Sequence, residues 1–487
     1  MAIRDDEGAM APAKPRQAVV FIHGMGEQRP METLRRFVKA LLPGGAYYSK
    51  PDEISDSYEL RRLKLRRRPA DDPEAKDWPD TDFYEYYWAH YMYGTLISHI
   101  VSWGWLVMNR GWTVCRTRPQ QLPPRLPSLV YTAWTITIVA VVLLVAILAY
   151  PLYCHQRGSC PSLAIMDVGW AAIVIAVLNV LLKYVVRPVA LGAILDVVGD
   201  AARYLDVNPT NVARRYDILR GGIAMLRKLH EDCDQEGDVV MYRYGRIVLV
   251  GHSLGSVIAY DILGHYFHEV NAKMPVNEDD FTEVENFSGS NDAPTFAGAD
   301  PYDKSEIFRT NQRLAWRRFM QHAPSGVRLP SRTRKHGRWI VTDLVTMGSP
   351  LAYAPILLAE GIDEFEAKKH MRELPTCPPD RSHSVKPGRF TINVSFETAR
   401  IYDALILQHH AFFAVTRWTN IFFTRDIIGG RLDRVFGTGI NDVELSGSSF
   451  LRAHSSYWSL HEIGGARCVD AVRSILTEAV GRDDPVS

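Results

Sequence analysis

One short stretch of the chain, RIVLVGHSLGSVIAYDIL, constrains the fold more than any other. Its apolar residues predict a buried strand over Ile247 to Val250 and a helix over Ser256 to Leu263, joined by a five-residue turn. Gly251 and Gly255 flank the middle of this turn, where only glycine keeps the strand and the helix from colliding. The pattern predicts an α/β fold in which the hydroxyl of Ser253 is exposed on a strained turn ahead of a helix N-terminus.

A second strand with a glycine-rich end lies near the N-terminus, in QAVVFIHGMGEQ. The apolar run from Ala18 to Ile22 predicts a strand, and His23, Gly24, Met25 and Gly26 follow it at once. Glycines there allow the backbone to approach a site closely and to point its N–H groups into it. Taken alone, HGMG does not indicate catalysis, because a strand-to-helix turn without a catalytic role can have the same pattern.

Together the two motifs resemble the lipases and esterases of the α/β-hydrolase family. HGMG is similar to the family's oxyanion loop, and GHSLG is similar to its nucleophile elbow. The run WIVTDLVTM, from Trp339 to Met347, enters Gly348-Ser349-Pro350, as a later strand of the family often does. The resemblance implies a mostly parallel central sheet flanked by helices and the chain order nucleophile, acid, histidine. The sequence shows no metal-ligand cluster, Walker loop or dinucleotide fingerprint, so no cofactor and no metal are expected.

The resemblance assigns a catalytic triad to Ser253, Asp426 and His454. Asp426 follows an apolar run from Trp418 to Phe423, and His454 comes 28 residues later, near the C-terminus. In these roles His454 takes the proton of Ser253, and Asp426 fixes the tautomer of the imidazole. Asp433 and Asp442 lie in the same region and are alternative acids.

The resemblance also assigns the oxyanion hole to the backbone N–H groups of Met25 and Leu254. Other histidines compete with His454 for the role of base, and two of them, His23 and His252, are expected to pack around the site. The other competing candidates are His409 and His410.

The middle of the chain predicts a membrane hairpin. Residues Leu129 to Tyr150 hold no charge over 22 positions, enough to cross a hydrocarbon core as a helix. A second run, from Leu163 to Leu182, holds one charge, Asp167. Arginine and lysine flank the pair on its outer sides, so the positive-inside rule places both long parts of the chain in the cytoplasm, at a bacterial inner membrane or an equivalent. Two buried core helices are the alternative interpretation.

Further segments are compatible with a membrane surface. Tyr84 to Met108 is rich in Trp and Tyr, which favours an interfacial segment over a third span. The basic run from Arg61 to Arg68 suits either anionic headgroups or a solvated loop. Cys154 and Cys160, in the outward connector, form either a disulfide or two free thiols, and the other four cysteines should be reduced. The N-terminus has no apolar stretch of the kind found in a cleaved leader.

These features divide the chain into three parts. Residues 1–108 form the first part of the α/β domain, 109–188 the membrane hairpin, and 189–487 the rest of the domain. The polar stretch of 265–338 predicts an inserted cap or lid, with a mobile segment from Phe287 to Pro301. A net charge of +1, from 56 Lys and Arg against 55 Asp and Glu, argues against nucleic acid as a partner.

The sequence therefore predicts a membrane-anchored serine hydrolase that cleaves an ester of a lipid or another hydrophobic acyl substrate. An acyltransferase or a thioesterase would use the same triad, since water and an alcohol compete for one acyl-enzyme. A catalytically silent membrane scaffold and a peptidase are further alternatives.

Overall fold

The computed structural model describes residues 16–25, 29–44, 47–55, 57–65, 78–92, 97–117, scattered positions within 127–145, and 204–205. It further describes 209–236, 239–288, 301–322, 338–380, 391–395, 403–448 and 452–478.

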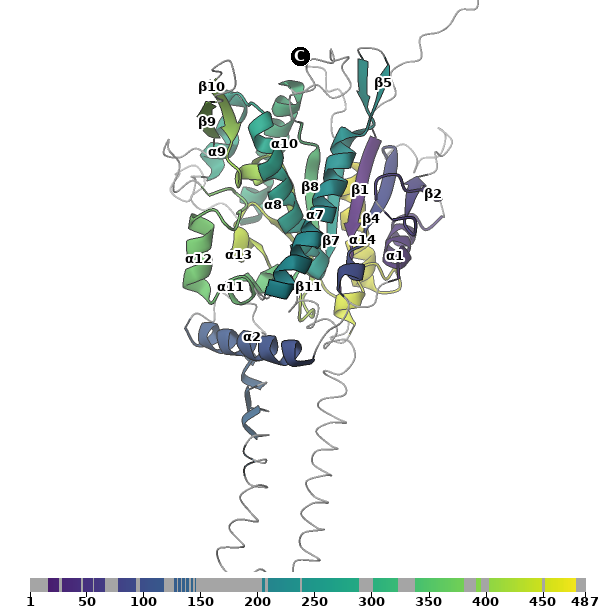
Figure 1. Cartoon of the computed structure of the whole chain (residues 1–487). Coiled ribbons are helices and arrows are strands. Elements are labelled where there is room, and N and C mark those ends of the chain that lie inside the picture. The colour runs from purple at the N-terminus through teal and green to yellow at the C-terminus, as the bar shows by residue number, and fades with distance from the viewer. Residues whose placement is uncertain are drawn as a thin grey trace, which may run out of the picture.

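An eight-stranded sheet forms the centre of the molecule (Figure 1). Neighbouring strands pair in parallel from β4 through β1, β7, β8 and β11 to β12, whereas β3 is antiparallel to both β4 and β2. In order across the sheet, the strands are β12 (Asn441–Leu445), β11 (Arg417–Phe423), β8 (Val341–Met347), β7 (Tyr244–His252), β1 (Arg16–Ile22), β4 (Thr81–Tyr86), β3 (Arg61–Leu65) and β2 (Tyr47–Pro51). The predicted α/β class with a mostly parallel central sheet is confirmed.

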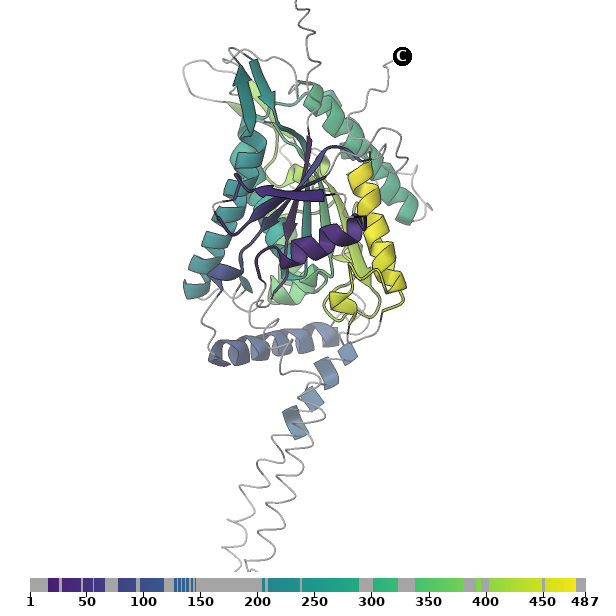
Figure 2. The same ribbon diagram turned by 90° about the vertical axis from the view of Figure 1, so that its right-hand side faces the viewer.

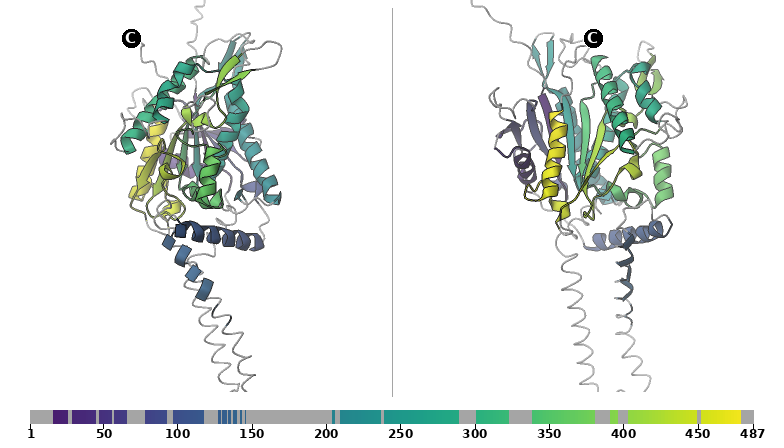
Figure 3. Two further views of the ribbon diagram at one scale, coloured as in Figure 1. Left: turned by 90° about the vertical axis from the view of Figure 1, so that its left-hand side faces the viewer. Right: turned by 180° about the vertical axis from the view of Figure 1, so that it is seen from behind.

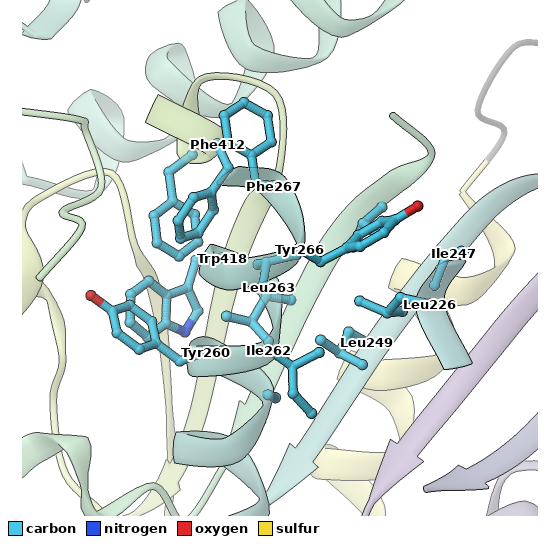
Figure 4. Packing of buried hydrophobic residues seen from close by; sticks show 14 of the residues in the cluster. Leu226, Ile247, Leu249, Tyr260, Ile262, Leu263, Tyr266, Phe267, Phe412 and Trp418 are labelled. Atoms are coloured by element: carbon cyan, nitrogen blue, oxygen red, sulfur yellow. The ribbon is translucent and has the colours of Figure 1, made fainter. Parts of the chain in front are cut away.

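Helices cover both faces of the sheet, as Figure 2 shows. Helices α7 (Pro209–Glu231) and α8 (Leu254–Val270) lie on one face, and α1 (Glu32–Leu41) and α14 (Ile463–Thr477) on the other. Successive side chains of a strand point to opposite faces, so in β1 Val20 packs under α7 and α8 whereas Phe21 packs under α1 and α14. Figure 4 shows the first of these cores, where Trp418 and Tyr260 have ring centroids 5.5 Å apart.

Smaller elements complete the fold. The helices are α2 (Ile97–Thr117), α9 (Thr282–Ser288), α10 (Pro301–His322), α11 (Ala354–Leu357), α12 (Ile362–His370) and α13 (Asp433–Phe436). The two-stranded sheets are β5 (Cys233–Glu236) with β6 (Val239–Tyr242), and β9 (Thr391–Ser395) with β10 (Asp403–Leu407). The short 3₁₀ helices are η2 (Ala89–Tyr91), η5 (Asn271–Lys273), η6 (Glu278–Asp280), η9 (Pro350–Tyr353), η10 (Ala411–Ala414) and η11 (Ala453–Ser455).

The first part of the basic run from Arg61 is a strand, so the loop interpretation is wrong there, and contact with anionic headgroups stays a prediction. Its first five residues form strand β3, and Arg62 is buried, 3.5 Å from the carboxylate of Asp82 on β4. Leu63, the next residue of the strand, points to the opposite face and enters the core there. The rest of the run lies outside the described residues.

Part of the predicted insertion belongs to the core. Helix α10 buries Phe308 and Trp316, and the indole N–H of Trp316 donates to the carbonyl of Trp339, 3.0 Å away. The guanidinium of Arg309 donates to the carbonyl of Trp418 at 2.9 Å. Residues 289–300, which hold most of the predicted mobile segment, and 323–337 lie outside the described residues.

Helix α2 crosses the molecule beside the carboxyl ends of the strands (Figures 1 and 3). Its Val114 and Cys115 are buried against Ile356 and Ile362, which follow β8 in the chain. In the described part of the chain, no helix is both long enough and apolar enough to cross a membrane. The predicted span 163–182, with Cys154 and Cys160, lies outside the described residues, as does much of 129–150. The other four cysteines are free, as predicted.

Burial of neutral histidines makes this fold sensitive to acid. His230 lies in the core, where its Nδ1 donates to the carbonyl of Leu226 at 2.8 Å and its Nε2 accepts the N–H of Ile340 at 3.3 Å. Burial, aided by the charge of Arg338, lowers the pKa of His230 from 6.5 to about 3. The unfolded chain therefore binds an extra proton once the pH falls below about 6.5, and stability is lost from there downward.

We expect His230→Gln to reduce the pH dependence of unfolding between pH 6 and 4 by about 1.4 kcal/mol per pH unit. Urea unfolding in detergent, followed by tryptophan fluorescence at several pH values, measures this slope. The same change at His461, which is exposed, is the control. Equal slopes in the wild type and both variants would contradict the prediction.

Candidate active site

The chemistry-bearing residues predicted from the sequence meet at one edge of the sheet. Ser253 follows β7, and His23 with Gly24 and Met25 follows β1. Asp426 comes three residues after β11, and His454 lies in η11, which follows β12 in the chain. Carboxyl ends of parallel strands share an edge, so four separate segments converge there.

The turn around Ser253 has the predicted strained geometry. Ser253 has φ 54° and ψ −130°, a conformation that few residues other than glycine adopt. Its N–H donates to the carbonyl of Met347 on β8 at 2.9 Å, which holds the turn in place. A β-carbon on Gly251 would lie 2.5 Å from the α-carbon of Ser256, and one on Gly255 would overlap the carbonyl oxygens of Ile22 and His23. The predicted reason is confirmed for Gly251, whereas Gly255 is required by the end of β1 and not by the strand of its own turn.

Ser253, His454 and Asp426 form a chain of hydrogen bonds. Nε2 of His454 lies 2.9 Å from Oγ of Ser253, and Nδ1 lies 2.9 Å and 3.1 Å from the two carboxylate oxygens of Asp426. An ionised carboxylate only accepts hydrogen bonds, so Nδ1 carries the imidazole proton. Nε2 is then left with a lone pair that accepts a hydrogen bond from the hydroxyl of Ser253.

The environment of Asp426 keeps it ionised. Its side chain is buried, which alone would raise its pKa, but His454 and several hydrogen bonds lower the pKa to about 2. One carboxylate oxygen accepts the N–H of Ile428 at 2.9 Å, and the other accepts the hydroxyl of Tyr457 at 2.7 Å. The carboxylate is therefore charged and fixed in direction at neutral pH.

The two alternative acids turn away from His454. Asp442 accepts the N–H groups of Leu432 and Asp433 at 3.0 Å each and the amide of Asn420 at 2.6 Å. Asp433 in turn accepts the guanidinium of Arg431 at 2.6 Å. Both carboxylates shape the loop after β11, and Asp426 is the one that contacts the histidine.

The glycine-rich loop after β1 packs directly on Ser253. A β-carbon on Gly24 would lie 2.8 Å from the β-carbon of Ser253, so glycine is needed for this approach. Met25 is buried next in the chain, and Gly26 lies outside the described residues. Leu254 is the first residue of α8, where backbone N–H groups have no partner within the helix. The oxyanion roles of Met25 and Leu254 stay predictions.

His252 and His23 are buried and neutral beside the site. Burial lowers the pKa of His252 to about 3 and that of His23 to about 4. Nε2 of His252 donates to the carbonyl of His454 at 3.0 Å, which ties the loop of His454 to the turn of Ser253. His23 stacks on Trp88, whose indole N–H donates to the carbonyl of His23 at 2.9 Å. Both pack around the site as predicted.

His409 and His410 belong to another region. Nε2 of His410 lies 3.0 Å from the carbonyl of Asp380, and the rings of the two histidines are 5.4 Å apart. Within the described ranges, no group of three or more His, Cys, Asp or Glu side chains is arranged to hold a metal ion.

Sequence reasoning missed two contributors to the site. Tyr457, three residues after His454, donates to Asp426 and also accepts the N–H of Phe423 at 3.3 Å. Gly348 has φ +56°, and a β-carbon there would lie 2.9 Å from the carboxylate of Asp426. The Gly-Ser-Pro sequence after β8 signalled the glycine, whereas no pattern in the sequence signalled the tyrosine.

Two glycines of the same helix should respond differently to one substitution. Gly255→Ala would drive a methyl group into the backbone of β1, and we expect at least about 3 kcal/mol of destabilisation. Gly264→Ala places its methyl 3.4 Å from the ring of Phe412, an ordinary contact, and should be close to neutral. Thermal unfolding of both variants tests this, and similar midpoints would contradict the close approach at Gly255.

Comparison with known proteins adds no relative. No family model matches the chain, and neither the curated proteins nor the solved structures include a match. A function for this chain is therefore proposed from its own residues.

Proposed function

We propose that the chain is a membrane-anchored serine hydrolase of the α/β-hydrolase fold that cleaves carboxylic esters of lipids or other hydrophobic acyl substrates. The observation that carries the proposal is the continuous hydrogen-bonded chain from Ser253 through His454 to the buried Asp426. The order of these residues in the sequence and the strained turn of Ser253 support the fold assignment.

In the first half of the reaction, Oγ of Ser253 attacks the carbonyl carbon of the ester. Nε2 of His454 takes the hydroxyl proton as the new bond forms, and Asp426 stabilises the resulting imidazolium. The tetrahedral intermediate then collapses, and the same Nε2 returns the proton to the leaving alcohol. An acyl group remains on Ser253. In the second half of the reaction, Nε2 of His454 takes a proton from water as the water attacks the acyl carbon, and it returns that proton to Oγ of Ser253 as the acid leaves.

Charge on the carbonyl oxygen needs donors that are fixed before the reaction begins. Leu254 offers its N–H at the start of a 17-residue helix, whose N-terminal end carries partial positive charge. Met25 is the second proposed donor, because the contact of Gly24 with Ser253 brings that loop to the reacting atom. Each donor is worth about 3 kcal/mol in reactions of this type.

The membrane anchor is proposed from the uncharged runs 129–150 and 163–182, with the α/β domain on the cytoplasmic side. An acyltransferase or thioesterase remains compatible with the same three residues, because the acyl-enzyme is common to all three reactions. A silent scaffold would not need a buried carboxylate oriented on a histidine.

The first test is labelling of the purified full chain in detergent with a fluorophosphonate. We expect the wild type to be labelled and both Ser253→Ala and His454→Ala to lose labelling, since one removes the nucleophile and the other removes its base. Unlabelled, folded wild type, also in the presence of lipid vesicles, would favour the scaffold.

The second test separates the acid from its neighbour. Asp426→Asn should lower kcat on an ester by roughly 10³-fold to 10⁴-fold, because the amide no longer fixes the Nδ1–H tautomer of His454. Asp442→Asn, the matched change on the neighbouring strand β12, should lower kcat by less than about tenfold, because the hydrogen bonds of Asp442 go to other residues than the histidine. Ester hydrolysis by folded protein measures both, and equal losses would contradict the role of Asp426.

A further inference from the structure

Exposed apolar side chains gather at the edge of the sheet that holds Ser253. Five of them, which we name the catalytic rim, are between 38% and 72% exposed. They lie on α2, on the helical residues that follow it, just before α14 and at its first residue, and they are Leu106, Trp112, Tyr131, Leu460 and Ile463.

Contacts within the fold fix both halves of the rim at this edge. Helix α2 packs against α11, which follows β8, and the guanidinium of Arg110 lies 3.4 Å from the carbonyl of Ile356. A β-carbon on Gly464 would collide with the ring of Phe423, the last residue of β11, so Ile463 also sits at the carboxyl end of a strand. Figures 1 and 2 show the turn before α14 beside one end of α2.

The rim continues into a strongly apolar helical surface. Trp112 meets Tyr131 edge to face at 5.4 Å, and the indole of Trp134 donates to the carbonyl of Met108 at 3.4 Å. Beyond these rings the described positions lead away from the sheet (Figure 1). Those described as exposed and large are all aliphatic, namely Ile138, Val139, Val142 and Val145.

An aromatic zone followed by an aliphatic zone matches the order of the headgroup boundary and the hydrocarbon in a bilayer. Aliphatic side chains suit the hydrocarbon, whereas Trp and Tyr suit the headgroup boundary next to it. The stretch from Leu129 to Tyr150 contains no charge that would oppose insertion. Trp112 and Tyr131, two of the rim residues, form this aromatic boundary.

We propose that the catalytic rim lies in the headgroup and upper acyl region of a phospholipid bilayer, so that Ser253 receives its ester directly from the membrane. The inference rests on the proposed function and adds the source of the substrate. The side chain of His454 is 23% exposed whereas that of Asp426 is fully buried, so solvent reaches the triad at its histidine, and Leu460 and Ile463 follow this histidine closely in the chain.

The chain offers a matched control for the rim. Ile307 and Leu314 on α10 are 39% and 37% exposed and of the same residue types as Ile463 and Leu106. Helix α10 lies toward the opposite end of the sheet, where Trp316 bonds to Trp339 just before β8. A polar substitution at Ile307 and Leu314 also removes exposed apolar surface, but it should not change the contact of the rim with a membrane.

The first experiment measures lipid contact without any substrate. Cysteine is placed singly at 106, 463, 307 or 314 in the full chain with Cys154, Cys160 and Cys233 replaced by Ser, labelled with an environment-sensitive fluorophore, and reconstituted in phosphatidylcholine vesicles. Brominated phosphatidylcholine should quench the probes at 106 and 463 and leave those at 307 and 314 unchanged. Equal or absent quenching at all four positions would overturn the proposal.

The second experiment measures where the ester comes from. For Leu106→Asp with Ile463→Asp, we expect hydrolysis of a long-chain fluorogenic ester embedded in vesicles to fall about tenfold, with a short water-soluble ester changed less than about twofold. The control pair Leu314→Asp with Ile307→Asp should retain both activities. Unchanged vesicle hydrolysis in the rim variant would contradict the inference alone, whereas a wild type inactive on both esters would contradict the proposed function alone.

Discussion

At Gly255 the first turn of α8 comes so close to the end of β1 that no side chain fits between them. The carbonyl oxygens of Ile22 and His23 occupy the space that a β-carbon would take. This approach places the glycine-rich loop against Ser253, and Gly24 closes the gap from the other side. Without it, the two motifs, more than two hundred residues apart in the sequence, would not share a site.

Around that contact, the polar groups of the site form a hydrogen-bonded network with defined donors and acceptors. Asp426 is buried yet ionised, because His454, Tyr457 and the backbone of Ile428 all donate to it. His252 donates to the carbonyl of His454 and contacts Trp458 edge to face at 4.8 Å. The histidine is therefore held at its ring by Asp426 and at its backbone by His252, and neither support needs a proton to move.

Sequence patterns predicted those parts of the molecule whose cause is local. The strands of Ala18 to Ile22 and of Ile247 to Val250 are continuous apolar runs, and Gly251 is required by atoms of its own turn. Asp426 and His454 could be proposed because they come in the expected order after their strands. The uncharged runs predicted the membrane hairpin by the same local rule, and that part stays a prediction.

Features that depend on contacts between distant segments could not be predicted. Tyr457 acts through a carboxylate 31 residues earlier, and Asp442 is excluded as the acid only by the N–H groups that surround it. Arg62 is buried in a strand, where the carboxylate of Asp82 on β4 lies 3.5 Å from its guanidinium. In each case the residue type allowed several roles, and a partner elsewhere in the chain selected one.

The pairing of β1 with β7 also has a consequence for synthesis of the chain. Ile22 pairs beside Gly251, so about 230 residues, including the predicted hairpin, are made before the central strand gains this neighbour. At about 5–20 residues per second, that interval is roughly 10–50 s. During this time β1 presents an apolar strand edge with unpaired backbone groups, which is a template for aggregation. A chaperone bound to the nascent N-terminal segment would therefore matter more for this chain than for one whose central strands are neighbours in sequence.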